Sequence, residues 1–168
     1  MGIRSMKQWE GDKCWSDRFL PEIKRILGEH LIGEPPLEED QERNTDLIVL
    51  KMEAIRVGCR VRRNEYLKRY PDEFTIRAGR PSGIKTELTK VIEGWGNYFF
   101  YGFSDLEEIN LLKWSLCDLN VFRLWFNRRL ATGKMPGFKK ENKDNSSSFI
   151  AFNFSQLPSE FIIAQEPQ

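Results

Sequence analysis

The chain has 168 residues, of which 40% are hydrophobic and 30% charged, and its formal net charge is +1. These values are ordinary for one soluble globular domain, and they exclude a uniformly basic protein that coats nucleic acid. No stretch reaches the ~18 uncharged apolar residues of a membrane span, and the first ten residues lack the apolar core of a signal peptide.

Cysteine and histidine usage limits the kinds of site that the chain can build. Three widely spaced cysteines and one histidine, with no Cys-x-x-Cys pair, exclude a standard structural zinc site. Such cysteine usage is typical of a reducing compartment. We expect a cytoplasmic protein with no membrane partner, organised as a single domain over residues 1–168 with its core at about 15–130.

The first predicted element is a helix from about Ser16 or Asp17 to residue 31, followed by a loop with an acidic run at 38–40. Residues 46–50 then form an expected short buried strand that opens with Asp46. The helix is predicted because apolar residues recur at spacings of three and four and form one stripe. These residues are Trp15, Phe19, Ile23, Ile26, Leu27 and Leu31.

Residues 55–62 and 74–78 alternate with the two-residue period of β-strands. Such a strand places its apolar residues on one face of a sheet and its polar residues on the other. Two neighbouring strands of this kind would make a sheet with one apolar and one cationic face. The cationic side chains of this stretch are Arg56, Arg60, Arg62 and Arg77.

The rest of the chain alternates between helical and strand-like patterns. Thr86 is a suitable N-cap for a short helix. The spacing of leucine and phenylalanine over 105–130 predicts a longer one. The other expected elements are an aromatic strand at 97–103, a polar loop at 131–148, and a C-terminal strand and tail at 149–168, the tail being loosely held from Pro158.

Charge is distributed unevenly along the chain. Residues 29–46 hold seven acidic side chains and one arginine, whereas residues 51–90 hold eleven Lys or Arg against five Asp or Glu. A basic surface next to an acidic cluster fits a polyanionic ligand that binds together with a metal ion. A charged, solvated surface is the alternative for each of these residues taken singly.

The order of predicted elements resembles that of restriction-endonuclease-like proteins, the PD-(D/E)xK nuclease superfamily, from about Trp15 to Phe103. The resemblance implies an α/β (α+β) fold in which helices flank a single mixed central β-sheet. It also implies that residues 46–50, 55–62, 74–78 and 97–103 are neighbouring strands of that sheet.

The resemblance further implies a Mg²⁺ site. In this superfamily a strand begins with a metal-binding Asp, for which Asp46 would stand, and Glu29 on the first helix would join it. The next strand normally carries Asp/Glu-x-Lys, but this chain has Arg60-Val61-Arg62. Arginine neither ligates Mg²⁺ nor acts as a general base. Glu87 is therefore the candidate second ligand, and Lys90 lies three residues beyond it.

Each of these residues also has a structural alternative. Asp46 could cap a turn or pair with Arg62, and Glu87 could simply stabilise the start of its helix. The three arginines at 60, 62 and 77 would repel one another unless anions or carboxylates lie between them. Phosphate is the anion that the guanidinium group is best suited to bind, although internal salt bridges would serve as well.

Three functional hypotheses follow. The first is a Mg²⁺-dependent DNA endonuclease that hydrolyses phosphodiester bonds, with Asp46, Glu87 and Arg62 catalytic and Asp46, Glu29 and Glu87 holding the metal. The second is a non-catalytic DNA-binding protein that uses the same cationic face. The third is a structural or interaction protein whose arginines form internal salt bridges. The expected nucleic-acid contacts are Arg56, Arg60, Arg62, Arg77 and Lys90.

Overall fold

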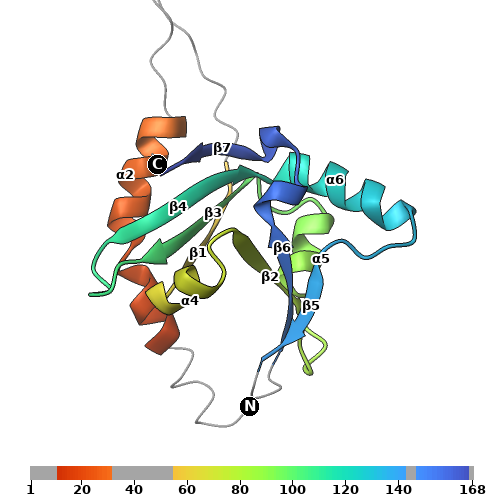
Figure 1. Ribbon diagram of the computed structural model, residues 1–168, viewed down its shortest axis with the longest axis horizontal. Coiled ribbons are helices and arrows are strands. Elements are labelled where there is room, and N and C mark those ends of the chain that lie inside the picture. The colour runs from red at the N-terminus through yellow and green to blue at the C-terminus, as the bar shows by residue number, and fades with distance from the viewer. Residues whose placement is uncertain (1–10, 32–54, 143–146, 167–168) are drawn as a thin grey trace, which may run out of the picture. The chain divides into compact units, whose positions relative to one another are not determined.

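The computed structural model describes residues 11–31, 55–142 and 147–166 (Figure 1). The chain divides into two compact units between Ile55 and Arg56. The first unit contributes a helical stretch at 11–17 and helix α2, Leu20–Leu31, which confirms the helix predicted there. Within it the rings of Trp15 and Phe19 meet edge to face, with their centroids 5.1 Å apart. The strand predicted at 46–50 lies outside the described residues.

The second unit contains a mixed four-stranded sheet in the order β1-β3-β4-β7 (Figure 1). Strand β1 runs parallel to β3, whereas β4 is antiparallel to both β3 and β7. The strands span Val57–Arg62 (β1), Tyr98–Ser104 (β3), Leu111–Asp118 (β4) and Ile162–Gln165 (β7).

A second, antiparallel sheet has the order β2-β6-β5. Three helices and two short 3₁₀ turns connect the strands of the two sheets. The strands span Glu73–Gly79 (β2), Phe138–Glu141 (β5) and Ser148–Asn153 (β6). The helices span Asn64–Arg69 (α4), Glu87–Ile92 (α5) and Leu119–Ala131 (α6), and the turns Phe154–Gln156 (η1) and Ser159–Phe161 (η2).

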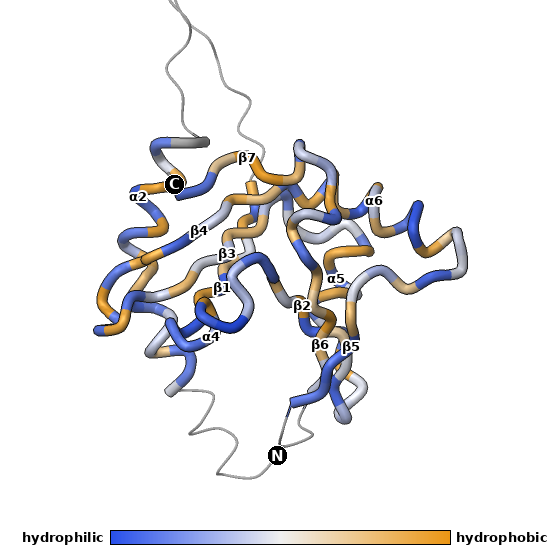
Figure 2. The backbone as a smooth tube through the Cα atoms, in the orientation of Figure 1, coloured by the Kyte–Doolittle hydropathy of each residue, from blue (hydrophilic) through white to orange (hydrophobic). Residues whose placement is uncertain are grey.

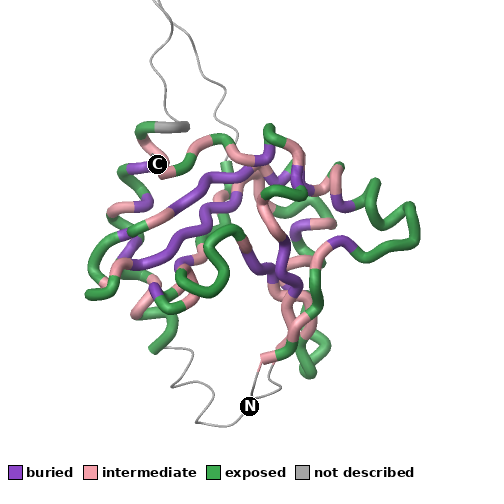
Figure 3. Tube along the Cα trace, viewed as in Figure 1, coloured by how far each residue is buried: buried purple, intermediate pink, exposed green. Residues whose placement is uncertain are grey.

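Aromatic side chains fill the space between the two sheets and α6. Phe74 of β2 stacks on Phe152 of β6 at 5.2 Å, and Phe122 of α6 meets the same Phe152 edge to face at 5.2 Å. Tyr101 and Phe103 of β3 belong to this buried cluster, and buried residues are concentrated along β3 and β4 (Figure 3). Burial of this much aromatic surface is the main favourable term that holds the sheets together.

Local sequence accounts for where the helices begin. The hydroxyl of Thr86 accepts the N–H of Thr89 at 3.4 Å, which confirms Thr86 as the N-cap of α5. The carboxylate of Asp118 caps α6 by accepting the N–H groups of Asn120 and Val121. Helix α4 has the sequence Asn-Glu-Tyr-Leu-Lys-Arg and is largely hydrophilic (Figure 2).

The expectation of a single central sheet is wrong. Strands β1 and β2 were predicted to be neighbours, yet they lie in different sheets. Helix α4 separates them, and β2 pairs instead with β6, which follows it by about seventy residues. The strand meander expected from the nuclease resemblance is therefore not formed by these two segments. The fold is an α/β arrangement of one mixed four-stranded sheet, one antiparallel sheet and several helices.

The helix expected over 105–130 is also wrong in its first half. Residues 111–118 form β4, and the helix begins at Leu119. Leu112 and Leu116 have helical spacing, but in the strand Leu112 is 51% exposed while Leu116 is fully buried. Residues 138–141 form β5 within the expected polar loop, and the expected loose tail supplies β7. Strand pairing with distant residues overrides the local pattern at each place.

No helix in the described part of the chain is long and apolar enough to cross a membrane. The longest of them, α6, has thirteen residues and carries three arginines.

The turn between β3 and β4 is held by Asp105. Its carboxylate accepts hydrogen bonds from the backbone N–H groups of Ile109 at 2.9 Å and Asn110 at 3.1 Å. These bonds, led by that from Ile109, hold the pKa of Asp105 below its ordinary value because they favour the ionised form.

Asp105 should therefore contribute stability that depends on pH. Because its folded-state pKa is lowered, the contribution is present above the unfolded-state pKa of 3.8 and is lost as the pH falls through the lower folded-state value. We expect Asp105→Asn to lower the melting temperature at pH 7, and the difference from the wild type to shrink towards pH 2. Glu107→Gln in the same turn is the control for charge. Equal melting temperatures of Asp105→Asn and the wild type at pH 7 would contradict this assignment.

Candidate functional site

The two arginines of β1 lie on the face of their sheet that meets the second sheet. In the strand register Arg60 is beside Tyr101 and Arg62 is beside Phe103, and both of those β3 residues belong to the buried cluster. The alternation in β1 therefore does separate arginines from apolar residues. The arginine side, however, does not form an open cationic surface, because it borders the aromatic core.

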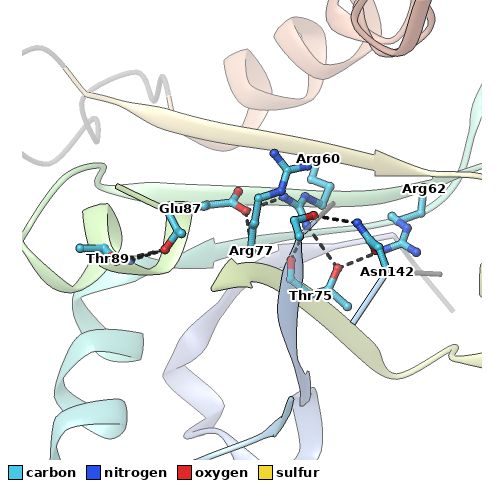
Figure 4. Close-up of polar contacts among 9 residues, drawn as sticks. Arg60, Arg62, Thr75, Arg77, Glu87, Thr89 and Asn142 are labelled. Atoms are coloured by element: carbon cyan, nitrogen blue, oxygen red, sulfur yellow. Dashed lines mark hydrogen bonds and ion pairs between the residues drawn. The ribbon is translucent and has the colours of Figure 1, made fainter. Parts of the chain in front are cut away.

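Arg60 joins the edge strand of one sheet to the edge strand of the other. Its Nη1 donates to the backbone carbonyl of Thr75 at 3.0 Å and to the Thr75 hydroxyl at 3.3 Å. Its Nη2 forms an ion pair with Glu87 of α5 (Figure 4). The same Glu87 oxygen accepts the backbone N–H of Arg77 at 3.1 Å. Glu87 therefore fastens α5 to both β1 and β2.

Arg62 reaches the same threonine from one pleat farther along β1. Its Nη1 donates to the Thr75 hydroxyl at 2.9 Å (Figure 4). Its guanidinium lies 4.0 Å from the centre of the Tyr66 ring. No carboxylate among the described residues forms an ion pair with Arg62. The hydroxyl and the ring fix the direction of this side chain without neutralising its charge.

Two cations thus converge on one neutral oxygen. The Nη1 atoms of Arg60 and Arg62 lie 3.3 Å and 2.9 Å from the same Thr75 hydroxyl oxygen, so the two guanidinium groups are close neighbours. Glu87 forms an ion pair with Arg60, whereas no described carboxylate forms an ion pair with Arg62. Repulsion between half-buried like charges is relieved when an anion binds, so this arrangement favours a negatively charged ligand next to Arg62.

A cleft of about 690 Å³ opens beside Arg62. Helix α4 and its C-cap residue form one wall, with Glu65, Tyr66, Arg69 and Tyr70, while Asn142 and residues of β1, β2, β3, β5 and β6 form the rest. Its cationic residues are Arg62, Arg69 and Lys140, and its acidic residues are Glu65, Glu73 and Glu141. Its aromatic residues are Tyr66, Tyr70, Tyr101, Phe103 and Phe149.

Lys140 of β5 is held in this cleft much as Arg62 is. Its Nζ lies 4.5 Å from the centre of the Tyr70 ring and 3.5 Å from a carboxylate oxygen of Glu73. A cation above a ring face is attracted by the ring quadrupole. Two cation–ring pairs, Arg62 with Tyr66 and Lys140 with Tyr70, therefore line the cleft.

The predicted metal ligands Glu29 and Glu87 belong to different units, and each has a partner within its own unit. Glu29 lies in α2 and pairs with Arg25 one turn away, and Glu87 is engaged by Arg60 and by the N–H of Arg77. No group of three or more His, Cys, Asp or Glu that could hold a metal ion occurs in the described ranges. Asp46 lies outside them, so the predicted Mg²⁺ site and the catalytic role of Asp46 stay predictions.

The predicted nucleic-acid contacts divide into two groups. Arg60, Arg62 and Arg77 come from facing edge strands and meet around Thr75 and Glu87. Arg56 and Lys90 are exposed and do not line the cleft. The internal pairing that the sequence left open as an alternative is thus present for Arg60, through Glu87.

Sequence reasoning missed the wall formed by α4. No role was assigned from the sequence to the tyrosines of residues 64–72. Tyr66 lies in α4, and Tyr70, four residues later, is the C-cap residue that follows the helix. That spacing was the available signal, but it has meaning only once the segment is known to be helical.

No protein-family model, curated protein or solved structure matches the chain.

The bridging role of Glu87 can be tested by its effect on stability. We expect Glu87→Gln to lower the free energy of unfolding by about 1–2 kcal/mol, because the side chain is only 32% exposed and Arg60 loses its charged partner. The measurement is urea unfolding followed by circular dichroism.

Glu93→Gln is the matched control for this change. Glu93 pairs with Lys85 at 2.8 Å, but the lysine side chain is 64% exposed, so we expect a change of at most about 0.5 kcal/mol. Equal effects of the two substitutions would show that Glu87 does not join the sheets energetically.

Proposed function

We propose that the protein binds nucleic acid through its phosphates and that Arg62 is the principal phosphate contact. The observation that carries the proposal is the shared bond to Thr75. Arg60 and Arg62 converge on one hydroxyl, and Glu87 balances only the first of them. A phosphate oxygen at Arg62 supplies the missing negative charge.

The geometry of Arg62 suits this role. A guanidinium has five N–H donors, and the bond to Thr75 uses one of them. The Tyr66 ring, 4.0 Å away, holds the guanidinium in place, so the donors that remain are directed before a ligand arrives. Arginine held in this way binds phosphate with two parallel hydrogen bonds, which makes the interaction directional as well as electrostatic.

The charge of the whole second unit supports the proposal. Residues 56–168 contain eighteen Lys or Arg and thirteen Asp or Glu, an excess of five positive charges. Residues 1–55 contain eight Lys or Arg and twelve Asp or Glu. The modest net charge of the chain is therefore the sum of a negative first unit and a positive second unit. A structural unit with a net positive charge attracts polyanions and raises the rate at which they associate with it.

Arg62 provides the most direct test. We expect Arg62→Ala to weaken binding of DNA about tenfold at all sequences alike, and to reduce the slope of log K against log salt by about 0.7–0.9, the value for one phosphate contact. Fluorescence anisotropy of a labelled oligonucleotide, titrated at several salt concentrations, measures both quantities.

Arg128→Ala is the matched control, because Arg128 is exposed near the end of α6 and outside the cleft. It removes the same charge and should change affinity by less than about twofold. The proposal fails if Arg62→Ala and Arg128→Ala behave alike, and a structural or interaction role would then be favoured.

The acidic residues of the cleft give a prediction of opposite sign. Glu73 is next to Lys140, whereas Glu65 and Glu141 are exposed, where they repel a polyanion. We expect Glu65→Gln to tighten DNA binding about twofold to threefold at low salt, with the gain disappearing at high salt as the charges are screened. Weaker binding by this variant would argue against a phosphate path past α4.

Cleavage of the bound nucleic acid is a separate hypothesis. It depends on Asp46, which lies outside the described residues. The resemblance to restriction-endonuclease-like proteins likewise stays a hypothesis, and the proposed binding does not depend on it. Incubation of plasmid DNA with the protein and Mg²⁺ or Mn²⁺, with Asp46→Asn as control, tests the activity.

A further inference from the structure

We infer that the nucleic acid bound in this cleft is single-stranded, and that one of its bases stacks against the aromatic lining. This inference rests on the proposed function and names the form of nucleic acid that the site takes. Three observations support it: aromatic residues line the cleft, some of their rings are exposed, and cationic residues lie beside those rings.

Aromatic residues make up five of the thirteen residues that line the cleft. In a duplex the two faces of each base are covered by neighbouring bases, so a protein reaches only phosphates and groove edges. Rings recessed in a cleft can therefore stack only on a base that is unpaired and unstacked. A site built to hold duplex phosphates alone has no need of these rings.

The exposure of the rings differs in a way that fits one inserted base. Tyr101 and Phe103 are each 3% exposed and form the floor, whereas Tyr70 is 40% exposed at the rim. Phe149 is intermediate between them. Hence Tyr70 and Phe149 are the rings that a base can cover without any movement of the core.

Cations flank the accessible rings. In the second sheet Arg77 pairs across the strands with Phe149, and Phe149 pairs with Lys140, so the ring lies between two basic residues in one row. Lys140 also lies against Tyr70. A base on either ring thus has a cation beside it, where the phosphates of its own strand can be bound.

The size of the cleft agrees with such a ligand. Its volume of about 690 Å³ falls within the ~300–1,000 Å³ typical of sites for small organic groups. A nucleotide unit fits a recess of this kind, but a duplex, whose bases remain stacked, can only lie across its mouth. Because every base has an aromatic face, stacking here should depend little on sequence.

The test compares three ligands by fluorescence anisotropy and competition. They are a labelled mixed-sequence twelve-nucleotide DNA without self-complementarity, the duplex of the same sequence, and a mononucleotide as competitor. We expect the single strand to bind at least tenfold more tightly than the duplex, and the mononucleotide to compete only at far higher concentration.

Variants at the rim separate ring stacking from charge. Tyr70→Ala should weaken single-strand binding about fivefold to a hundredfold and leave duplex binding nearly unchanged, whereas Tyr70→Phe keeps the ring and should bind like the wild type. Trp95→Ala is the matched control, because Trp95 is 63% exposed and outside the cleft. Its affinity for single strands should stay within about twofold of the wild-type value.

The outcomes distinguish this inference from the proposed function. Equal or tighter binding of the duplex, or unchanged single-strand binding by Tyr70→Ala, overturns the inference and leaves phosphate binding by Arg62 intact. The inference is also overturned if the mononucleotide displaces the labelled strand at a concentration similar to that of unlabelled strand. That result would indicate a small-molecule site. Failure of both DNA forms to bind overturns the proposed function and the inference together.

Discussion

The arrangement of the second unit depends on one interaction, in which Arg60 and Arg62 both donate to the hydroxyl of Thr75. Both arginines come from the edge strand β1 of the four-stranded sheet, and Thr75 lies in the edge strand β2 of the other sheet. The two sheets share an aromatic core, but core packing does not fix which edges meet. Directional bonds from the guanidinium groups do, because each requires its acceptor at a definite place.

Glu87 determines how much of this positive charge remains for a ligand. Its carboxylate neutralises Arg60 and holds the N–H of Arg77, so that pair belongs to the framework. Arg62 is held by a neutral hydroxyl and a ring, which orient a charge without cancelling it. The difference between the two arginines is therefore a difference in their partners, since both occupy the same face of the same strand.

In the proposed function the cleft combines two kinds of recognition. Its cations attract phosphate from a distance, and its rings act only at contact. Placing a cation against a ring gives both functions to one pair of residues, as in Arg62 with Tyr66 and Lys140 with Tyr70. Such a surface holds a flexible strand well, because neither phosphate contact nor stacking reads the sequence of the bases.

By itself the sequence determined the local elements: α2, the strands β1, β2, β3 and β6, the capped helix α5, and the presence of several arginines in alternating strand positions. Periodicity and capping depend on near neighbours in the chain, so they can be read without a fold. Only the tertiary structure decided that β2 pairs with β6, that 111–118 is a strand, and that Arg62 lies beside Tyr66 and Thr75. These facts join residues distant in the chain, and the free energy that selects such pairings comes from packing and hydrogen bonds that no local pattern contains.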